Sequence, residues 1–98
     1  MTTICHISVR GRVQGIGYRA FVQREALSFG VEGWVRNRRD GSVEAVLCGE
    51  ADAVAAVIES CRRGPYGARV LSLDERQGTE DELNARLPGE AFSELPTL

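Results

Sequence analysis

The hydrophobic and polar positions at the start of the chain follow two successive periods. Residues 3–11 (TICHISVRG) alternate apolar and polar side chains, which predicts a strand with one buried face. Residues 18–30 (YRAFVQREALSFG) follow the helical period instead, and Gly30 suits the C-terminal end of a helix. The apolar stripe of this predicted helix consists of Tyr18, Phe21, Val22, Ala26 and Phe29.

The middle of the chain has the pattern of a hairpin followed by a second helix. Two strand candidates, 31–37 (VEGWVRN) and 41–49 (GSVEAVLCG), flank an Asp-Gly pair, which is a good hairpin signal. A helical stripe then occupies residues 51–64 and stops at Gly64-Pro65. Its members are Val54, Val57, Ile58 and Cys61.

The last part of the chain completes the predicted fold. Residues 68–78 (ARVLSLDERQG) alternate again, and FSEL at 92–95 is a candidate for a short fifth strand closed by Pro96. The order β-α-β-β-α-β is typical of the α+β, ferredoxin-like sandwich, in which two helices cover one face of an antiparallel sheet. Right-handed crossovers place strands 3–11 and 41–49 side by side in its centre. We expect one domain over residues 1–98, without repeats or linkers.

Three cysteines at wide spacing do not form a disulfide framework. On its strand, Cys5 shares a face with Ile7 and Val9, toward the helices. Cys48 shares a face with Glu44, opposite the face of the apolar residues Val43, Ala45 and Leu47. The two thiols are therefore predicted on opposite faces of the sheet, and we expect no disulfide between them.

Composition limits the location and the ligands. No apolar run approaches the roughly 18 residues of a membrane span, and the first residues lack the pattern of a secretory signal, so we expect a cytoplasmic protein. Residues 1–43 carry a net charge of +4 and residues 44–98 a net charge of −6. A single histidine and no C-x-x-C pair make a metal site improbable. Every basic residue is arginine, which suits bidentate recognition of phosphate or carboxylate.

The segment GRVQGIGYR (11–19) contains three glycines and an arginine, but no acid, histidine or cysteine. Glycines between a strand and a helix allow successive backbone N–H groups to converge on an anion. The start of the following helix adds unpaired N–H donors and a partial positive charge. From the residues alone, the segment is either a phosphate-binding loop or a plain turn.

An RNA-binding sheet is a further alternative. GIGYRAFV (15–22) loosely resembles the aromatic strand motif of RRM domains, which share this topology. The segment follows the first strand instead of forming the third, however. The chain also has only six aromatic residues and a net charge of −2, which disfavours a nucleic-acid partner.

Two longer motifs resemble those of the acylphosphatase family. GRVQGIGYR at 11–19 matches its pattern G-x-V-Q-G-[VI]-x-[FY]-R, and GWVRNRRDGSVE at 33–44 matches G-W-V-x-N-x-x-D-G-S-V-E. The two lie 13 residues apart and in the expected order. The resemblance covers about residues 3–77, whereas the tail departs from the longer last strand that is frequent in the family.

The resemblance implies metal-free hydrolysis of the carboxyl–phosphate bond of small acyl phosphates, with no cofactor and inorganic phosphate as product. It implies that Arg19 binds the phosphate and that Asn37 holds the attacking water. The phosphate cradle, used mainly through backbone N–H groups, would consist of Arg12, Val13, Gln14, Gly15, Ile16, Gly17, Tyr18 and Arg19.

The proposed chemistry is consistent with a loop that lacks acid, base and nucleophile. An acyl phosphate brings a good leaving group, so the site needs only to orient a water and to stabilise phosphoryl charge. Tyr18 and Trp34 are expected to pack rather than to contact substrate, and His6 to be structural or exposed. A non-catalytic domain that binds an anion is the main rival. We expect a monomer.

Overall fold

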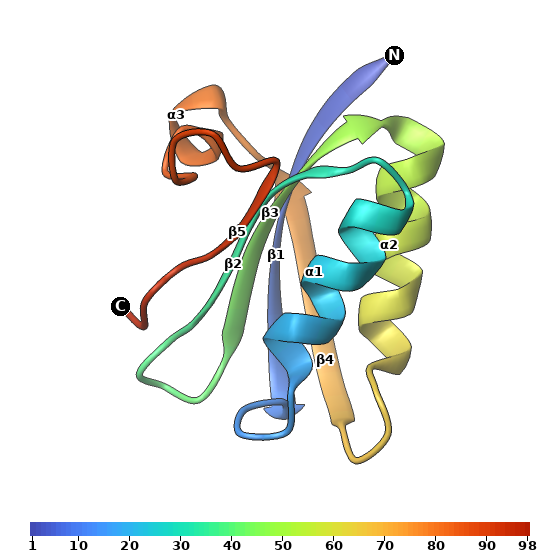
Figure 1. Ribbon diagram of the computed structural model, residues 1–98. Helices are drawn as coiled ribbons and strands as arrows, with labels where there is room; N and C mark the ends of the chain where they lie inside the picture. The colour runs from blue at the N-terminus through green and yellow to red at the C-terminus, as the bar shows by residue number, and fades with distance from the viewer.

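The computed structural model describes residues 1–98 and contains the predicted strands and helices in the predicted order, together with one short additional helix (Figure 1). None of the helices is long and apolar enough to cross a membrane. The elements are β1 Thr2–Arg12, α1 Tyr18–Ser28, β2 Glu32–Asn37, β3 Val43–Glu50, α2 Ala51–Arg63, β4 Arg69–Gln77, α3 Glu80–Leu83 and β5 Phe92–Glu94.

The strands form one sheet in the order β4-β1-β3-β2-β5. β1 lies between β3 and β4, and the three pairings among the first four strands are antiparallel. The predicted neighbours β1 and β3 are therefore confirmed. The predicted fifth strand also exists, but it runs parallel to β2, so the sheet is mixed rather than wholly antiparallel.

α1 and α2 lie side by side on one face of the sheet, and the main core fills the space between them and the strands (Figure 1). The predicted stripe of α2 is buried there. Ala45 and Leu47 of β3 belong to this core, whereas Val46 packs into a second cluster on the opposite face. Because Cys5 packs against the main core and Cys48 alternates with Leu47, the two cysteines lie on opposite faces, as predicted.

α1 ends before the last residue of its predicted stripe. Ser28 is its final helical residue, and Phe29 is 45% exposed rather than buried. The chain turns at Gly30, whose φ of 70° is left-handed, in keeping with the predicted helix end. Phe29 therefore does not continue the buried face of the helix.

α3 was not expected from the sequence, where the segment after β4 has only a polar pattern. Its first turn is closed by a capping box between Thr79 and Glu82. The short helix lies near the second cluster, in which Trp34, Val46 and Leu95 are buried. The indole Nε1–H of Trp34 donates to the carbonyl oxygen of Glu82 at 2.7 Å, so α3 closes over the open face beside β2. The packing role predicted for Trp34 is confirmed.

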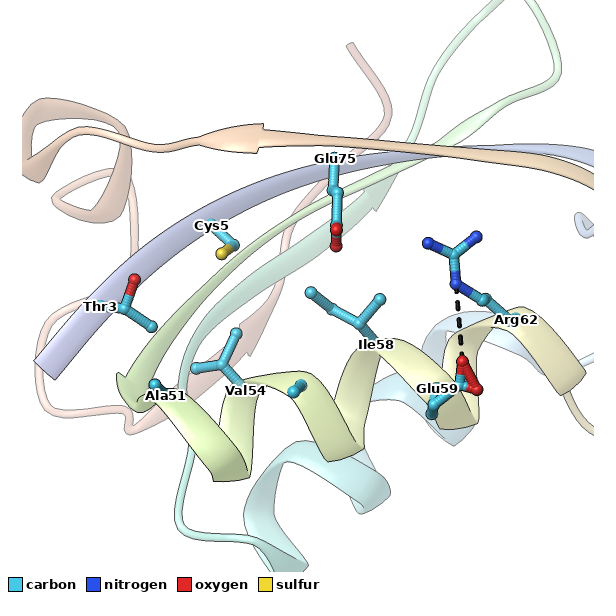
Figure 2. A pocket seen from close by; sticks show the side chains of 9 residues that line it. Thr3, Cys5, Ala51, Val54, Ile58, Glu59, Arg62 and Glu75 are labelled. Carbon is cyan, nitrogen blue, oxygen red and sulfur yellow. Dashed lines mark ion pairs between the residues drawn. The ribbon is translucent and has the colours of Figure 1, made fainter. Parts of the chain in front are cut away.

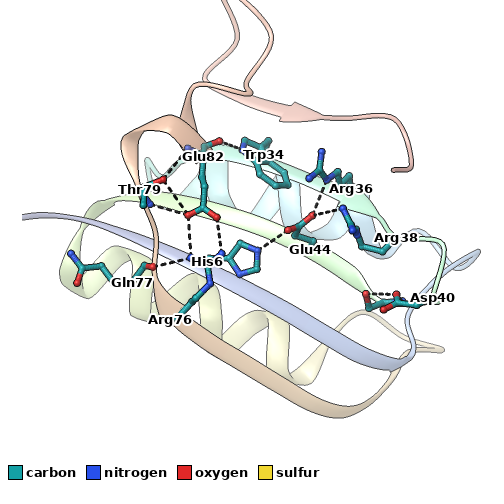
Figure 3. Close-up of polar contacts among 11 residues, drawn as sticks. His6, Trp34, Arg36, Arg38, Asp40, Glu44, Arg76, Gln77, Thr79 and Glu82 are labelled. Atoms are coloured by element: carbon teal, nitrogen blue, oxygen red, sulfur yellow. Dashed lines mark hydrogen bonds and ion pairs between the residues drawn. The ribbon is translucent and has the colours of Figure 1, made fainter.

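Several charged side chains also lie on the open face (Figure 3). His6 on β1 lies 2.7 Å from Glu44 on β3, and the guanidinium of Arg36 on β2 donates to the same carboxylate at 2.8 Å. Burial opposes ionisation of Glu44, but the hydrogen bonds from His6 and Arg36 hold its pKa below the ordinary value. His6 therefore has a structural role, which is one of the two possibilities predicted from the sequence.

Two motif glycines are required by the packing of neighbouring strands rather than by ligand binding. Gly11 has a φ of 131° at the point where the β1–β4 register shifts, and a Cβ there would clash with the carbonyl oxygen of Arg69. Gly33 has a φ of 146°, and a Cβ there would clash with the carbonyl oxygen of Val46. Both positions need glycine because neighbouring backbone approaches too closely for a side chain.

Candidate active site

The loop between β1 and α1 lies at the same end of the sheet as the β2–β3 hairpin turn (Figure 1). Val13 and Tyr18 hold the two ends of this loop, because both side chains are buried in the main core. The Tyr18 hydroxyl donates to the carbonyl oxygen of Cys61 at 2.6 Å, and burial raises the pKa of Tyr18. The loop is therefore fixed at both ends, and Tyr18 has the packing role that the sequence predicted.

Backbone N–H groups are exposed to a ligand where this loop meets α1. Gly15 and Gly17 have left-handed φ values of 76° and 80°, which residues with a Cβ rarely adopt. Gly17 is the N-cap of α1, no side chain caps the helix, and its first turn contains no acidic residue. The N–H groups of the first turn therefore remain free and carry the partial positive charge of a helix N-terminus.

Asn37 is the last residue of β2 and lies across the same pocket. Its side-chain carbonyl oxygen Oδ1 is buried and has no hydrogen-bond partner in the protein. The pocket has a volume of about 110 Å³. It is lined by Val13, Gly15, Gly17, Tyr18, Arg19, Ala20, Asn37 and Glu94.

The structure brings Arg19 and Asn37 together, along with part of the predicted phosphate cradle. Arg12, Gln14 and Ile16 lie outside the lining of the pocket. Arg12 is exposed at the end of β1, and Ile16 packs against the edge of the main core. Gln14 directs its side chain to the hairpin turn, where its amide donates to two backbone carbonyl groups.

Arg19 is the free positive charge of the pocket. Its guanidinium lies within 4.0 Å of no carboxylate, whereas Arg36 and Arg38 are both paired with Glu44. The half-buried side chain of Arg19 follows directly on the uncapped start of α1. Arginine and backbone donors thus converge in the pocket, and Arg19 is not paired with the one carboxylate of its lining, Glu94, which leaves the guanidinium available to a phosphate group.

Glu94 is a lining residue that the sequence did not reveal. It reaches the pocket because β5 runs parallel to β2, with Glu94 opposite Val35 in the register. The tail is held there by hydrogen bonds from Leu95 N–H to the Val35 carbonyl and from Leu98 N–H to the Asn37 carbonyl. No local pattern in the tail indicates this pairing.

The largest groove of the protein lies elsewhere, between α2 and strands β1 and β4 (Figure 2). It has a volume of about 400 Å³ and a largely apolar lining that includes Cys5, Val54 and Ile58. Its only arginine, Arg62, is within 3.7 Å of Glu59 and so is already engaged. None of the predicted site residues lies in it, and it lacks the convergent donors of the smaller pocket.

The chain contains no group of three or more His, Cys, Asp or Glu side chains arranged to hold a metal ion. Arg19 and the backbone dipoles of the loop and α1 contribute positive charge to the pocket.

Comparison with known proteins identifies the family of the chain. The family model described as Acylphosphatase matches residues 5–86. An acylphosphatase of Rhodopseudomonas palustris (strain BisB18) is 60% identical over 97 residues, which cover 99% of this chain and 98% of that protein. An acylphosphatase of Bradyrhizobium diazoefficiens is 53% identical over 95 residues, or 97% of this chain and 96% of that protein.

Solved structures show the same relationship. The crystal structure of acylphosphatase from Bacillus subtilis superposes with a TM-score of 0.82 at 34% identity, and the match covers 97% of this chain and 99% of that one. An acylphosphatase from Coxiella burnetii gives the same TM-score at 30% identity, with 96% and 93% covered. The fold, the full-length relatives and the family match together establish that this chain belongs to the acylphosphatase family and is an acylphosphatase, a hydrolase of acyl phosphates.

Proposed function

We propose that the pocket between the 13–17 loop, α1 and β2 is the site at which the enzyme hydrolyses small acyl phosphates. Arg19 and the backbone N–H groups of the loop hold the phosphoryl group, and Asn37 holds the attacking water. The observation that carries this proposal is the buried, unpartnered Oδ1 of Asn37 inside the pocket that also contains Arg19 and the uncapped start of α1.

A water molecule is the natural partner of Asn37 Oδ1. A buried carbonyl oxygen without a hydrogen bond costs about 1–3 kcal/mol, so a native structure rarely leaves one unused. A water donates one hydrogen to this oxygen and accepts a hydrogen bond from the side-chain NH₂ group. Its remaining lone pair is then free to attack phosphorus.

The phosphoryl group has its own binding elements. Arginine offers two parallel N–H donors to a pair of phosphoryl oxygens, and the free N–H groups after Gly17 add further donors. In the transition state, charge is spread over the equatorial phosphoryl oxygens, where these donors stabilise it. Of the predicted cradle, Val13, Gly15, Gly17, Tyr18 and Arg19 line the pocket and would contact the phosphoryl group, whereas Arg12, Gln14 and Ile16 would not.

The reaction balances without a covalent enzyme intermediate. The water oxygen forms a bond to phosphorus as the bond from phosphorus to the acyl oxygen breaks, and the carboxylate departs with the bonding electron pair. A phosphoryl oxygen takes the proton of the water, which gives inorganic phosphate. The pocket holds no Ser, Cys, His or Lys side chain, and the Tyr18 hydroxyl is engaged with the Cys61 carbonyl. The proposed direct transfer to water uses no covalent role of the remaining candidate, the Glu94 carboxylate.

We extend the proposal to the form in which the enzyme works. The enzyme would work as a monomer with residues 1–98 as one domain, because the loop, α1, β2 and β5 of a single copy are enough to line the pocket. Three free cysteines favour a reducing compartment, the cytoplasm. The net charge of −2 favours small anionic substrates over nucleic acid, and Arg19 with the backbone donors serves in place of a metal or other cofactor.

The test is the hydrolysis of acetyl phosphate by the wild-type protein and by Arg19→Ala, with and without a chelator. Wild type should release phosphate at the same rate with the chelator, and added inorganic phosphate should inhibit competitively. Arg19→Ala should lose about 10²–10³ in rate. Phosphate binding without turnover by the wild type would instead indicate an anion-binding domain and would overturn the proposal.

A further inference from the structure

Gln14 belongs to the loop that leads into α1, yet its side chain contacts the hairpin turn that follows Asn37. Its amide Nε2 donates to the carbonyl oxygens of Arg38 and Ser42, each at 2.8 Å. We propose that Gln14 is a positioning residue, which fixes the phosphate-binding loop at a set distance from Asn37. The inference rests on the proposed function, because it assigns Asn37 the water that Gln14 helps to place.

The two carbonyl groups do not need Gln14 to close the turn. Ser42 O already accepts from Arg38 N–H at 2.8 Å, and Arg38 O accepts from Gly41 N–H at 3.1 Å. The Asp40 carboxylate closes the same turn by accepting from the Ser42 N–H at 2.9 Å. The Gln14 amide is therefore a second donor to two carbonyl groups that each already accept a backbone hydrogen bond. Its contribution is a link between the loop and the hairpin.

The side-chain amide of Gln14 makes both hydrogen bonds in a partly buried environment. Both hydrogens of one planar amide group are used, so the contact fixes orientation as well as distance. Gln14 is half-buried, and Arg38 is covalently adjacent to Asn37. A shift of the loop relative to β2 would therefore break one or both hydrogen bonds before the phosphoryl site could move away from the water site.

Loss of this positioning should lower the rate of the reaction more than the affinity for phosphate. The phosphoryl donors all lie on the loop and on α1, so they stay together when the loop moves. The water site lies on β2, so the attack distance and the in-line angle change. A misplacement of about 1 Å between reacting groups costs as much as 10²-fold in rate.

A second contact with the same hairpin turn offers a control. Arg10 and Asp40 also join β1 to the hairpin, but they lie 3.5 Å apart and both side chains are 55% exposed. Exposed pairs of this kind contribute little, so Arg10→Gln should leave both kcat and phosphate affinity unchanged.

The first experiment compares Gln14→Met, which keeps the length of the side chain and removes its donors, with wild type and Arg10→Gln. The expected result for Gln14→Met is a kcat for acetyl phosphate about 10- to 100-fold lower, with an unchanged inhibition constant for inorganic phosphate. A loss of phosphate affinity as large as the loss of kcat would overturn the inference, and so would a wild-type kcat. A purely structural role would lower the melting temperature and leave kcat as it is.

The second experiment uses Gln14→Glu, which also keeps the inference falsifiable if Gln14→Met does not fold. Ionised, the new carboxylate would face two carbonyl oxygens and repel them, whereas the protonated acid has one O–H to donate. The kcat of this variant relative to wild type should therefore rise as the pH falls. A ratio that is independent of pH would contradict the positioning role.

A double-mutant cycle separates this inference from the proposed function. If Gln14 acts through Asn37, Gln14→Met should have no further effect on kcat in a protein that already carries Asn37→Ala. Additive losses would overturn the role of Gln14 and leave that of Asn37 intact. An Asn37→Ala protein with wild-type kcat would instead defeat the proposed function itself.

Discussion

Arg19, in the first turn of α1, and Asn37, the last residue of β2, line the same small pocket although they belong to separate elements and separate sequence motifs. The glycine loop alone presents donors for an anion but nothing that holds a nucleophile. Asn37 supplies the one buried acceptor without a partner. In the proposed function the pocket combines an anion site with a water site, which is what hydrolysis of an activated phosphate requires.

The type of positive charge at residue 19 should matter as well as its presence. Arg19→Lys keeps a charge but loses the planar pair of donors that matches two phosphoryl oxygens. We expect it to recover part of the activity lost in Arg19→Ala, with weaker phosphate inhibition than in wild type. Steady-state kinetics with acetyl phosphate checks this order, and Arg24→Lys, an exposed change on the same helix, is the control. Equal activity of Arg19→Lys and wild type would argue against bidentate binding.

Attack on phosphorus predicts where a labelled oxygen from water ends up. Hydrolysis in ¹⁸O-enriched water should place the label in inorganic phosphate and leave the released carboxylate unlabelled. Mass spectrometry of both products after a single turnover measures the distribution. Label in the carboxylate would show attack at the acyl carbon and would contradict the proposed roles of Asn37 and the phosphoryl donors.

The buried Tyr18 hydroxyl should stabilise the fold without taking part in chemistry. Cys61 lies in the last turn of α2, where carbonyl groups lack helical partners, so its hydrogen bond with Tyr18 satisfies an otherwise unpaired acceptor. Tyr18→Phe should lower the free energy of unfolding by about 1–3 kcal/mol. Tyr66→Phe is the matched control, because Tyr66 is fully exposed. Urea denaturation measures both, and equal stabilities would contradict the structural role of the hydroxyl.

Acid should destabilise the protein partly through Glu82. Hydrogen bonds from Arg76 lower the pKa of Glu82 from 4.5 to about 2 in the folded protein. A carboxyl group with a depressed folded pKa contributes stability above its unfolded pKa and loses it as the pH falls through the folded pKa. The contribution of Glu82 is therefore lost between pH 4.5 and about 2.

Glu82→Gln isolates this effect, because glutamine also completes a capping box. Melting temperatures measured across the acid range should show a shallower pH dependence for this variant than for wild type. Glu80→Gln removes a carboxylate from the same short helix without breaking the contact with Arg76. An identical pH dependence for wild type and Glu82→Gln would rule out the proposed stabilisation.

The parts of the fold that the sequence predicts are those with local periodicity or special glycines. The hairpin, the buried stripe of α2 and the opposite faces of Cys5 and Cys48 all follow from residues close together in the chain. The motifs that contain Arg19 and Asn37 are long and specific, so the sequence alone singles out both residues as candidates. Gly11, by contrast, belongs to the first motif but is needed because the backbone of β4 approaches it closely. The motif alone does not distinguish this structural requirement from ligand binding.

The parts that the sequence did not predict depend on contacts between distant residues. α3 has only a short polar sequence and is joined to β2 by the hydrogen bond from Trp34 to Glu82. β5 pairs in parallel with β2, and Gln23 on α1 donates to the Phe92 carbonyl at 3.0 Å. Pairing across such separations leaves no periodic signal, so neither the mixed sheet nor Glu94 in the pocket was visible from the chain alone.

The most direct measurement of the central claim is the effect of Asn37→Ala on kcat and on phosphate affinity in the same protein. If Asn37 holds the attacking water while Arg19 and the loop hold phosphate, kcat for acetyl phosphate should fall by about 100-fold or more. The inhibition constant for inorganic phosphate should stay at its wild-type value. A kcat equal to that of wild type, or a loss confined to phosphate affinity, would contradict the account.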